Sequence, residues 1–193
     1  LALLDYNQEK LDAIVRDLDL PAGRLYTRGV DLLDAPTLRA TAEAVSAKFG
    51  AIHALIHLVG GWTGGKSIPE ASADDLTFML NQHAWTTFNL FQVFVPHLAA
   101  SGWGRVITLS VPLTVHPFAK MGPYAAGKAA QEALVTTLAE EMRGQGVTAN
   151  IIHVQSIDAK GTGKGTSPAE IVAAMLYLCS DSAAKDTGAK IPL

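Results

Sequence analysis

The chain has 193 residues, of which 49% are apolar and 17% charged, and its formal net charge is −3. This composition predicts one globular domain over residues 1–193, and with no run of Lys and Arg it excludes a nucleic-acid-binding or anionic-membrane surface. No window approaches the roughly 20 uninterrupted apolar residues of a membrane span, and the single cysteine, Cys179, excludes an internal disulfide and fits a reducing, cytoplasmic location.

Apolar runs alternate with segments of helical periodicity along the whole chain. The expected strands are residues 1–4, 25–30, 54–59, 105–109 and 147–154, with a last short strand around Lys190 and Ile191. Four of the helices expected between them begin at capping residues, which are Asn7, Asp34, Ser72 and Ser167. The helix after Asp34 should stop at Gly50, and the helix after Ser72 should run to about His97.

This alternation predicts the fold class. Most of the expected strands are continuous apolar runs, which is typical of a parallel sheet covered by helices on both faces, so we expect a doubly wound α/β fold. Ligands of such sheets bind beyond the carboxyl ends of the strands. The residues expected to line that crevice are Asp5, Asp31, Gly60, Ser110 and Val154.

Tyr124 and Lys128 are four residues apart on an expected helix that runs to Arg143. Positions i and i+4 share one helix face, so the phenol and the ammonium can converge on one small volume. A nearby ammonium favours phenolate and lowers the pKa of a tyrosine, which suits a general acid/base at neutral pH. The alternative is a surface tyrosine beside a solvated lysine.

Residues 60–67 read GGWTGGKS and match the spacing of a nucleoside-triphosphate phosphate loop. Such a loop requires a helix that starts at its lysine, here Lys66, so that the helix amides face the phosphates. Pro69 disfavours helical geometry at Ile68, and the next capping signal comes only at Ser72. We therefore expect an ordinary glycine-rich loop beside the crevice.

The order and spacing of these elements resemble the short-chain dehydrogenase/reductase family over the whole chain. Residues 124–128 read YAAGK and match the family's Tyr-x-x-x-Lys signature, and residues 105–110 are similar to its strand leading to a catalytic serine. The resemblance implies an NAD(P)-binding Rossmann-like fold and hydride transfer between a nicotinamide and a small carbonyl or alcohol substrate.

The resemblance also implies roles for particular residues. Tyr124 would exchange a proton with the substrate, and Lys128 would lower its pKa and hold the nicotinamide ribose. Asp5 is similar to the acidic residue that binds the adenosine ribose in members that use NAD, so NAD is expected, with NADP possible. The expected cofactor-binding residues are Asp5, Asp31, Leu32, Val59, Gly60, Tyr124 and Lys128.

Two positions depart from the family pattern. The catalytic serine of the family corresponds to Val111, and Ser110 lies one place short, so Ser110 is either the catalytic hydroxyl or a loop hydroxyl bonded to backbone. The catalytic asparagine corresponds to His83, which is either part of a proton relay or a histidine of the core or of a subunit interface. The six histidines show no ligand spacing, so no metal site is expected.

The front of the chain also departs from the family, because the first strand and its glycine-rich phosphate loop are not found. In the family that strand lies between the strands expected at residues 1–4 and 54–59. The sheet would then have a gap with unpaired backbone groups, and we expect roughly 25 to 35 further residues at the N-terminus of the native protein.

The family resemblance leaves two function classes open. One is an NAD(P)-dependent oxidoreductase with Tyr124 as general acid/base, and the other is a non-catalytic member that keeps the fold as a nucleotide-binding or structural subunit. The helices expected at residues 72–97 and 124–143 are similar to a pair that packs against a second subunit in the family. A homodimer or homotetramer is therefore expected.

Overall fold

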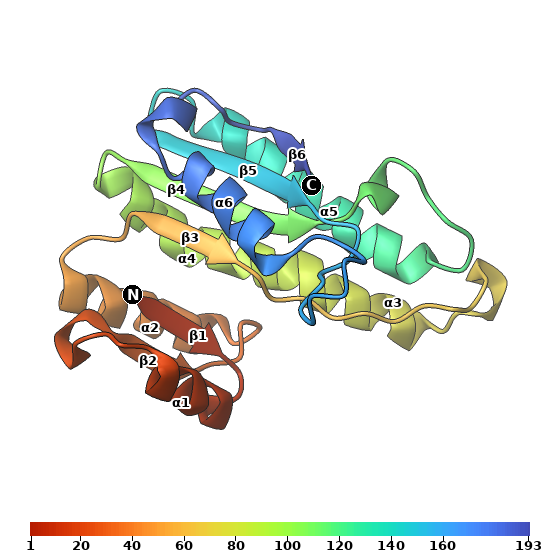
Figure 1. Ribbon diagram of the computed structural model, residues 1–193, viewed down its shortest axis with the longest axis horizontal. Helices are drawn as coiled ribbons and strands as arrows, with labels where there is room; N and C mark the ends of the chain where they lie inside the picture. The colour runs from red at the N-terminus through yellow and green to blue at the C-terminus, as the bar shows by residue number, and fades with distance from the viewer.

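The computed structural model describes residues 1–193 and contains two parallel sheets (Figure 1). The smaller sheet pairs β1 (Ala2–Asp5) with β2 (Tyr26–Gly29). The larger sheet has the order β3-β4-β5-β6, and its strands are β3 (Ala54–His57), β4 (Gly104–Ser110), β5 (Val147–His153) and β6 (Lys190–Pro192). Every strand pair is parallel, so the expected α/β fold is confirmed.

Helices connect the strands. They are α1 (Gln8–Asp17), α2 (Ala35–Phe49), α3 (Ala73–Leu80), α4 (Thr86–Ala100), α5 (Gly122–Glu141) and α6 (Pro168–Leu178). The four expected N-caps are confirmed, because each accepts a hydrogen bond from a backbone N–H of its first turn; they are Asn7, Asp34, Ser72 and Ser167. None of these helices combines the length and the apolar character needed to cross a membrane.

The helix expected from Ser72 to about His97 is not continuous. A π-helical turn (Asn81–Trp85) separates α3 from α4. Periodicity could not reveal this turn, because one wider turn changes the apolar pattern very little. Single π turns inside helices are frequent at functional sites, and this one carries His83.

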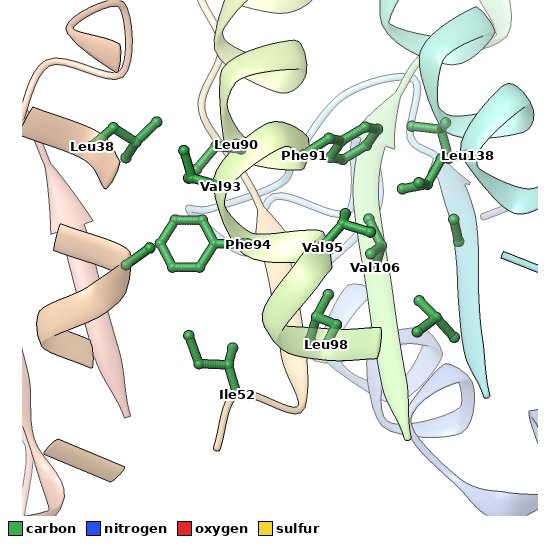
Figure 2. Close-up of a cluster of buried hydrophobic side chains, with 14 of the residues drawn as sticks. Leu38, Ile52, Leu90, Phe91, Val93, Phe94, Val95, Leu98, Val106 and Leu138 are labelled. Carbon is green, nitrogen blue, oxygen red and sulfur yellow. The ribbon is translucent and has the colours of Figure 1, made fainter. Parts of the chain in front are cut away.

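The larger sheet is buried on both faces. Val106 on β4 belongs to the main core, whereas its neighbour Ile107 belongs to a second apolar cluster under α6. Because successive side chains of a strand point to opposite faces, α4 and α5 cover one face and α6 covers the other. Figure 2 shows the main core, in which Phe94 and Leu98 of α4 lie among residues of α2, β4 and α5.

The two sheets are not hydrogen-bonded to each other, so the gap expected between β1 and β3 is present. Ile56 on β3, the strand beside this gap, is 43% exposed. The smaller sheet joins the rest of the molecule through α2, which packs against α4 and contributes Leu38, Ala42 and Val45 to the main core.

Candidate active site

Parallel strands bring the crevice residues to one side of the molecule. The carboxyl ends of β1, β3, β4 and β5 point in the same direction in Figure 1. Asp5 ends β1, Gly60 follows β3 and Ser110 ends β4. Helix α5 follows the loop after β4, and its first turn carries Tyr124. Pro123 is the second residue of this helix, where the fixed φ of proline suits the first turn.

Tyr124 and His83 lie against each other. Their ring centroids are 5.6 Å apart and the rings meet edge to face at 72°. His83 is 1% exposed, and its Nε2 donates a hydrogen bond to the carbonyl oxygen of Gly61 at 3.0 Å. Two glycines leave room for the ring, because a Cβ at Gly60 would lie 3.1 Å from His83 Cε1 and one at Gly127 would lie 3.1 Å from Cδ2.

The electrostatics keep His83 neutral. Burial, and then the charge of Lys128, lower the pKa of His83 to about 4, although its hydrogen bond to Gly61 acts in the opposite direction. With Nε2 protonated, Nδ1 is an acceptor, and it has no hydrogen-bond partner within the protein. The histidine is therefore a neutral group beside the phenol at neutral pH.

Lys128 is buried one helical turn from Tyr124. Its Nζ donates to the carbonyl oxygen of Leu109 at 2.8 Å and to Oε1 of Gln131 at 3.0 Å. Burial lowers the pKa of Lys128 to about 8, and the charge of Glu132 acts in the opposite direction. An ammonium has three N–H groups, so one remains for a ligand.

The expected lowering of the Tyr124 pKa is wrong for this geometry. Burial raises the pKa of Tyr124 above its ordinary value. The reason is that the Lys128 ammonium is directed toward Leu109 and Gln131, while the phenol loses solvent. Tyr124 is therefore a protonated phenol at neutral pH.

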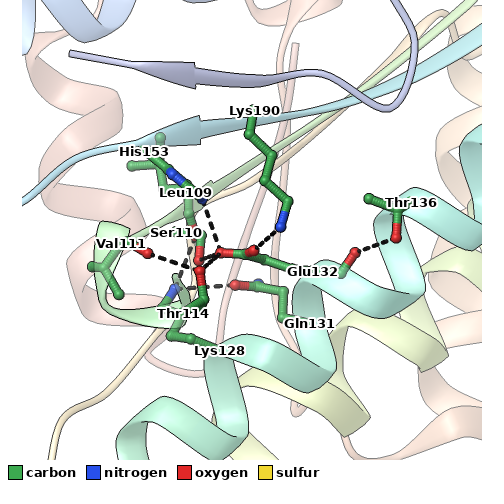
Figure 3. A network of polar contacts seen from close by, with 10 residues as sticks. All are labelled: Leu109, Ser110, Val111, Thr114, Lys128, Gln131, Glu132, Thr136, His153 and Lys190. Atoms are coloured by element: carbon green, nitrogen blue, oxygen red, sulfur yellow. Dashed lines mark hydrogen bonds and ion pairs between the residues drawn. The ribbon is translucent and has the colours of Figure 1, made fainter. Parts of the chain in front are cut away.

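Ser110 is directed into a buried polar network that is shown in Figure 3. It is 2% exposed, and its hydroxyl donates to Oε1 of Glu132 at 2.5 Å. The alternative expectation of a loop hydroxyl bonded to backbone is wrong, because Ser110 is the last residue of β4 and its partner is a carboxylate. Val111, at the position of the family's catalytic serine, is half-buried.

The two carboxylates expected to bind the adenosine end of a cofactor follow neighbouring strands. Asp5 ends β1, and its Oδ1 accepts from the backbone N–H of Asn7 at 2.9 Å. Asp31 comes two residues after β2, and its Oδ1 accepts from the backbone N–H of Leu33 at 2.9 Å. Since β1 and β2 pair in parallel, both carboxylates lie at the carboxyl edge of the smaller sheet.

The other expected cofactor residues follow β2 and β3. Leu32 is buried, and its carbonyl oxygen accepts from Nδ2 of Asn89 at 2.8 Å. Val59 is half-buried and Gly60 is exposed beside His83. The residues present are compatible with the two ends of a dinucleotide, because carboxylates that can accept from ribose hydroxyls stand at one end and Lys128, with one N–H left for a ligand, stands at the other.

The glycine-rich loop does not have the geometry of a phosphate loop. Lys66 pairs with Asp75 at 3.0 Å, and α3 begins only at Ala73. Lys66 therefore precedes α3 in the chain and pairs with a carboxylate in the first turn of this helix, whereas the lysine of a phosphate loop would itself begin the helix. Within residues 1–193 no three His, Cys, Asp or Glu side chains gather as a metal-binding group.

Comparisons with known proteins agree with this fold. The profile of the short chain dehydrogenase family matches residues 1–168. The chain is 22% identical to the 3-oxoacyl-acyl-carrier-protein reductase FabG of Thermotoga maritima over 95% of this chain and 81% of that protein. It is 27% identical to D-threitol dehydrogenase of Mycolicibacterium smegmatis over 99% of this chain and 80% of that protein.

Solved structures share the fold. An NADPH-bound short chain oxidoreductase of Pseudomonas aeruginosa PAO1, described as containing an atypical catalytic center, superposes with a TM-score of 0.91 at 22% identity, covering 100% of this chain and 84% of that one. An NAD⁺-bound xylitol dehydrogenase gives a TM-score of 0.89 at 19% identity, covering 100% and 86%. The chain belongs to the short-chain dehydrogenase family, a family of NAD(P)-dependent oxidoreductases.

Sequence reasoning missed several residues of the site. Gln131 and Glu132 hold Lys128 and the end of β4, and Gly127 lets α5 approach the π turn. The available signal was their spacing, because positions four, seven and eight residues after a helical residue lie on the same side of the helix. Positions 128, 131 and 132 therefore share the sheet-facing side with Tyr124.

Proposed function

We propose that this protein transfers a hydride between NAD and a small carbonyl or alcohol substrate, with Tyr124 as the general acid/base. The observation that carries the proposal is the buried Lys128, which keeps one free N–H one helical turn from a half-buried tyrosine. A solvated surface pair would show neither the burial nor the shifted pKa values.

The state of Tyr124 favours its acting as an acid. A phenol with a raised pKa is protonated at neutral pH and can donate its proton to a carbonyl oxygen. A bound nicotinamide supplies the hydride that reaches the carbonyl carbon, and the product is an alcohol. Lys128 keeps one N–H that can donate to a hydroxyl of the bound nicotinamide ribose, so we assign this lysine to cofactor binding.

His83 supports Tyr124 as a neutral partner. A histidine with a pKa of about 4 is a poor proton carrier at neutral pH, which disfavours the relay role. Its ring instead fills the space between the phenol and the loop after β3 and fixes the direction of the phenol. We therefore propose that His83 holds the phenol of Tyr124 in place and that Tyr124 transfers the proton.

The test is turnover of a substrate panel by the purified protein and by Tyr124→Phe. The panel contains a 3-oxoacyl thioester and a polyol, which are the substrate types in the names of the similar proteins. Tyr124→Phe should keep NADH binding and lose about 10²–10⁴-fold in kcat. The matched control is Tyr6→Phe, because Tyr6 is 76% exposed and makes no side-chain hydrogen bond. Unchanged turnover in Tyr124→Phe contradicts the proposal.

A non-catalytic nucleotide-binding subunit is the second candidate. It is favoured by Val111 and His83, which stand where the family has a catalytic serine and asparagine. This candidate predicts tight NADH binding with no turnover anywhere in the panel. The same experiment therefore separates the two functions.

We also propose that the cofactor is NAD. The carboxylate of Asp5 at the end of β1 can accept hydrogen bonds from ribose hydroxyls and repels a phosphate in their place. Asp5→Ala should lower the ratio of kcat/KM for NAD over NADP by at least tenfold, which corresponds to about 1.4 kcal/mol. If this ratio is unchanged in Asp5→Ala, Asp5 does not contact the cofactor.

An apolar patch on the α3–α4 side supports a homodimer or homotetramer. Phe78, Trp85 and Phe88 are 44%, 53% and 39% exposed, whereas Met79 and Phe91 from the same segment are buried. Exposed aromatic side chains gathered on one helical segment are typical of an interface. Light scattering should report an oligomer that Trp85→Glu weakens, and a monomer at micromolar concentration counts against this assembly.

A further inference from the structure

The side of α5 that faces the sheet carries three buried polar residues in two turns. Lys128 is 6% exposed, Gln131 0% and Glu132 3%. Burying two opposite charges costs free energy unless each charge is paired and hydrogen-bonded. The contacts of these residues therefore indicate what the charges do.

Glu132 is the centre of the network in Figure 3. Its Oε1 accepts from Ser110 Oγ at 2.5 Å, Thr114 Oγ1 at 2.9 Å and His153 Nε2 at 2.9 Å. Its Oε2 accepts from Lys190 Nζ at 2.6 Å. One carboxylate thus ties α5 to the end of β4, to the turn after it and to strands β5 and β6.

Lys128 holds the neighbouring residue of β4. Its Nζ donates to the carbonyl oxygen of Leu109, one residue before the serine bound by Glu132. On its other side, Gln131 accepts from Lys128 and donates through Nε2 to Thr87 Oγ1 at 3.2 Å. The Thr87 hydroxyl in turn donates to the carbonyl oxygen of His83 at 2.6 Å. The ammonium is therefore fixed between β4 and the π turn.

We propose that Glu132 is a positioning residue of this site, which fixes the end of β4 against α5 and provides the negative charge that keeps the Lys128 ammonium protonated. The inference rests on the proposed function only in giving Lys128 a catalytic task. The bonds of Glu132, and its place one helical turn after Lys128, are features of the fold itself.

The charges around both groups support this assignment. His57 on β3 and His83 on the π turn face Lys128, and burial lowers their pKa values to about 3 and about 4, so both are neutral near pH 7. Tyr124 is a neutral phenol there. Among the groups that act on Lys128, only Glu132 opposes the effect of burial on its pKa.

The groups around Glu132 are donors. Burial by itself would raise the pKa of Glu132, but the hydrogen bonds from Lys190, Ser110, Thr114 and His153 outweigh it and hold the pKa below its ordinary value. Glu132 is therefore ionised throughout the range in which Lys128 titrates. A constant negative charge one helical turn away is the arrangement that the proposal requires.

The test is a direct titration of Lys128 by NMR in protein labelled at the lysine Cε carbons, with its signal identified by its loss in Lys128→Met. The midpoint should lie at about 8 in the wild type. In Glu132→Gln, which keeps the size but not the charge, it should fall by about one pH unit, a tenfold change in the protonation equilibrium. The matched control is Glu140→Gln, because Glu140 is on the same helix but exposed and paired with Arg143.

A second variant separates charge from packing and remains informative if Glu132→Gln does not fold. Glu132→Asp keeps the charge but shortens its reach, so the Lys128 midpoint should stay within about 0.3 pH units while amide hydrogen exchange over residues 110–114 becomes faster. An unchanged midpoint in folded Glu132→Gln, an equal drop in Glu132→Asp, or unchanged exchange in Glu132→Asp overturns the proposal. None of these measurements needs turnover, so an inactive protein would contradict the proposed function alone.

Discussion

Replacing Gly127 with alanine perturbs the contact between α5 and the π turn. A Cβ at Gly127 would lie 2.7 Å from the carbonyl oxygen of Met79, about 0.7 Å closer than an ordinary contact of 3.4 Å. The colliding atom belongs to the backbone, so no side-chain rotation relieves the clash. The helix must move away from the end of α3, which carries Met79, and from the π turn that follows it and carries His83.

Two opposing effects set the change in stability. Alanine is favoured over glycine in a helix by about 0.5–1 kcal/mol, whereas overpacking a tight contact costs about 1–3 kcal/mol. Gly127→Ala should therefore reduce the free energy of unfolding by about 0–2.5 kcal/mol. Displacement of Tyr124 relative to His83 should lower kcat by at least about tenfold, since catalysis is sensitive to shifts below 1 Å.

The assay combines urea unfolding with the rate of NADH-dependent carbonyl reduction. Gly23→Ala is the matched control, because a Cβ there meets nothing within 4 Å and its backbone does not require glycine. The control should be unchanged in rate and equal or up to about 1 kcal/mol higher in stability. If Gly127→Ala is more stable than the wild type and fully active, the close approach of α5 to the π turn does not matter for the site.

Two further predictions follow from the buried polar groups. The pKa values of His57 and His83 are lowered to about 3 and about 4, so the unfolded chain binds more protons than the folded chain below pH 6.5. The free energy of unfolding should therefore fall as the pH drops from 6.5 toward 4, by up to about 1.4 kcal/mol per pH unit for each histidine. Urea unfolding at several pH values measures this fall. A flat profile contradicts the burial of these rings. Ser110→Ala removes a hydrogen bond to a buried carboxylate and should cost about 1.5–3 kcal/mol of stability, with kcat reduced less than tenfold. A loss of about a hundredfold in kcat at unchanged stability would make Ser110 catalytic.

Local signals in the sequence predicted much of the fold. Asn7, Asp34 and Ser72 cap helices because a short polar side chain precedes an apolar stripe, and such a signal needs only a few neighbouring residues. The parallel pairing of the strands followed from the alternation of elements. Gly50 ends α2 with a positive φ of 78°, as its position after the last apolar residue indicated.

The site was harder to predict because its contacts join distant segments. Glu132 bonds with Ser110, His153 and Lys190, which are 22, 21 and 58 residues away, and no local pattern connects them. The pKa of Tyr124 was expected to fall because spacing alone cannot show where the neighbouring ammonium is directed. Its direction depends on bonds to the end of β4 and to α5 that only the folded chain provides.

Transfer of deuterium from NADH labelled at C4 of the nicotinamide is the most direct measurement of the central claim. With the carbonyl compound that the panel identifies, we predict deuterium on the former carbonyl carbon of the alcohol product. We also predict that Tyr124→Phe binds NADH but slows this transfer by at least about a hundredfold. Equal transfer rates in the wild type and Tyr124→Phe, or a product free of deuterium, would contradict hydride transfer assisted by Tyr124.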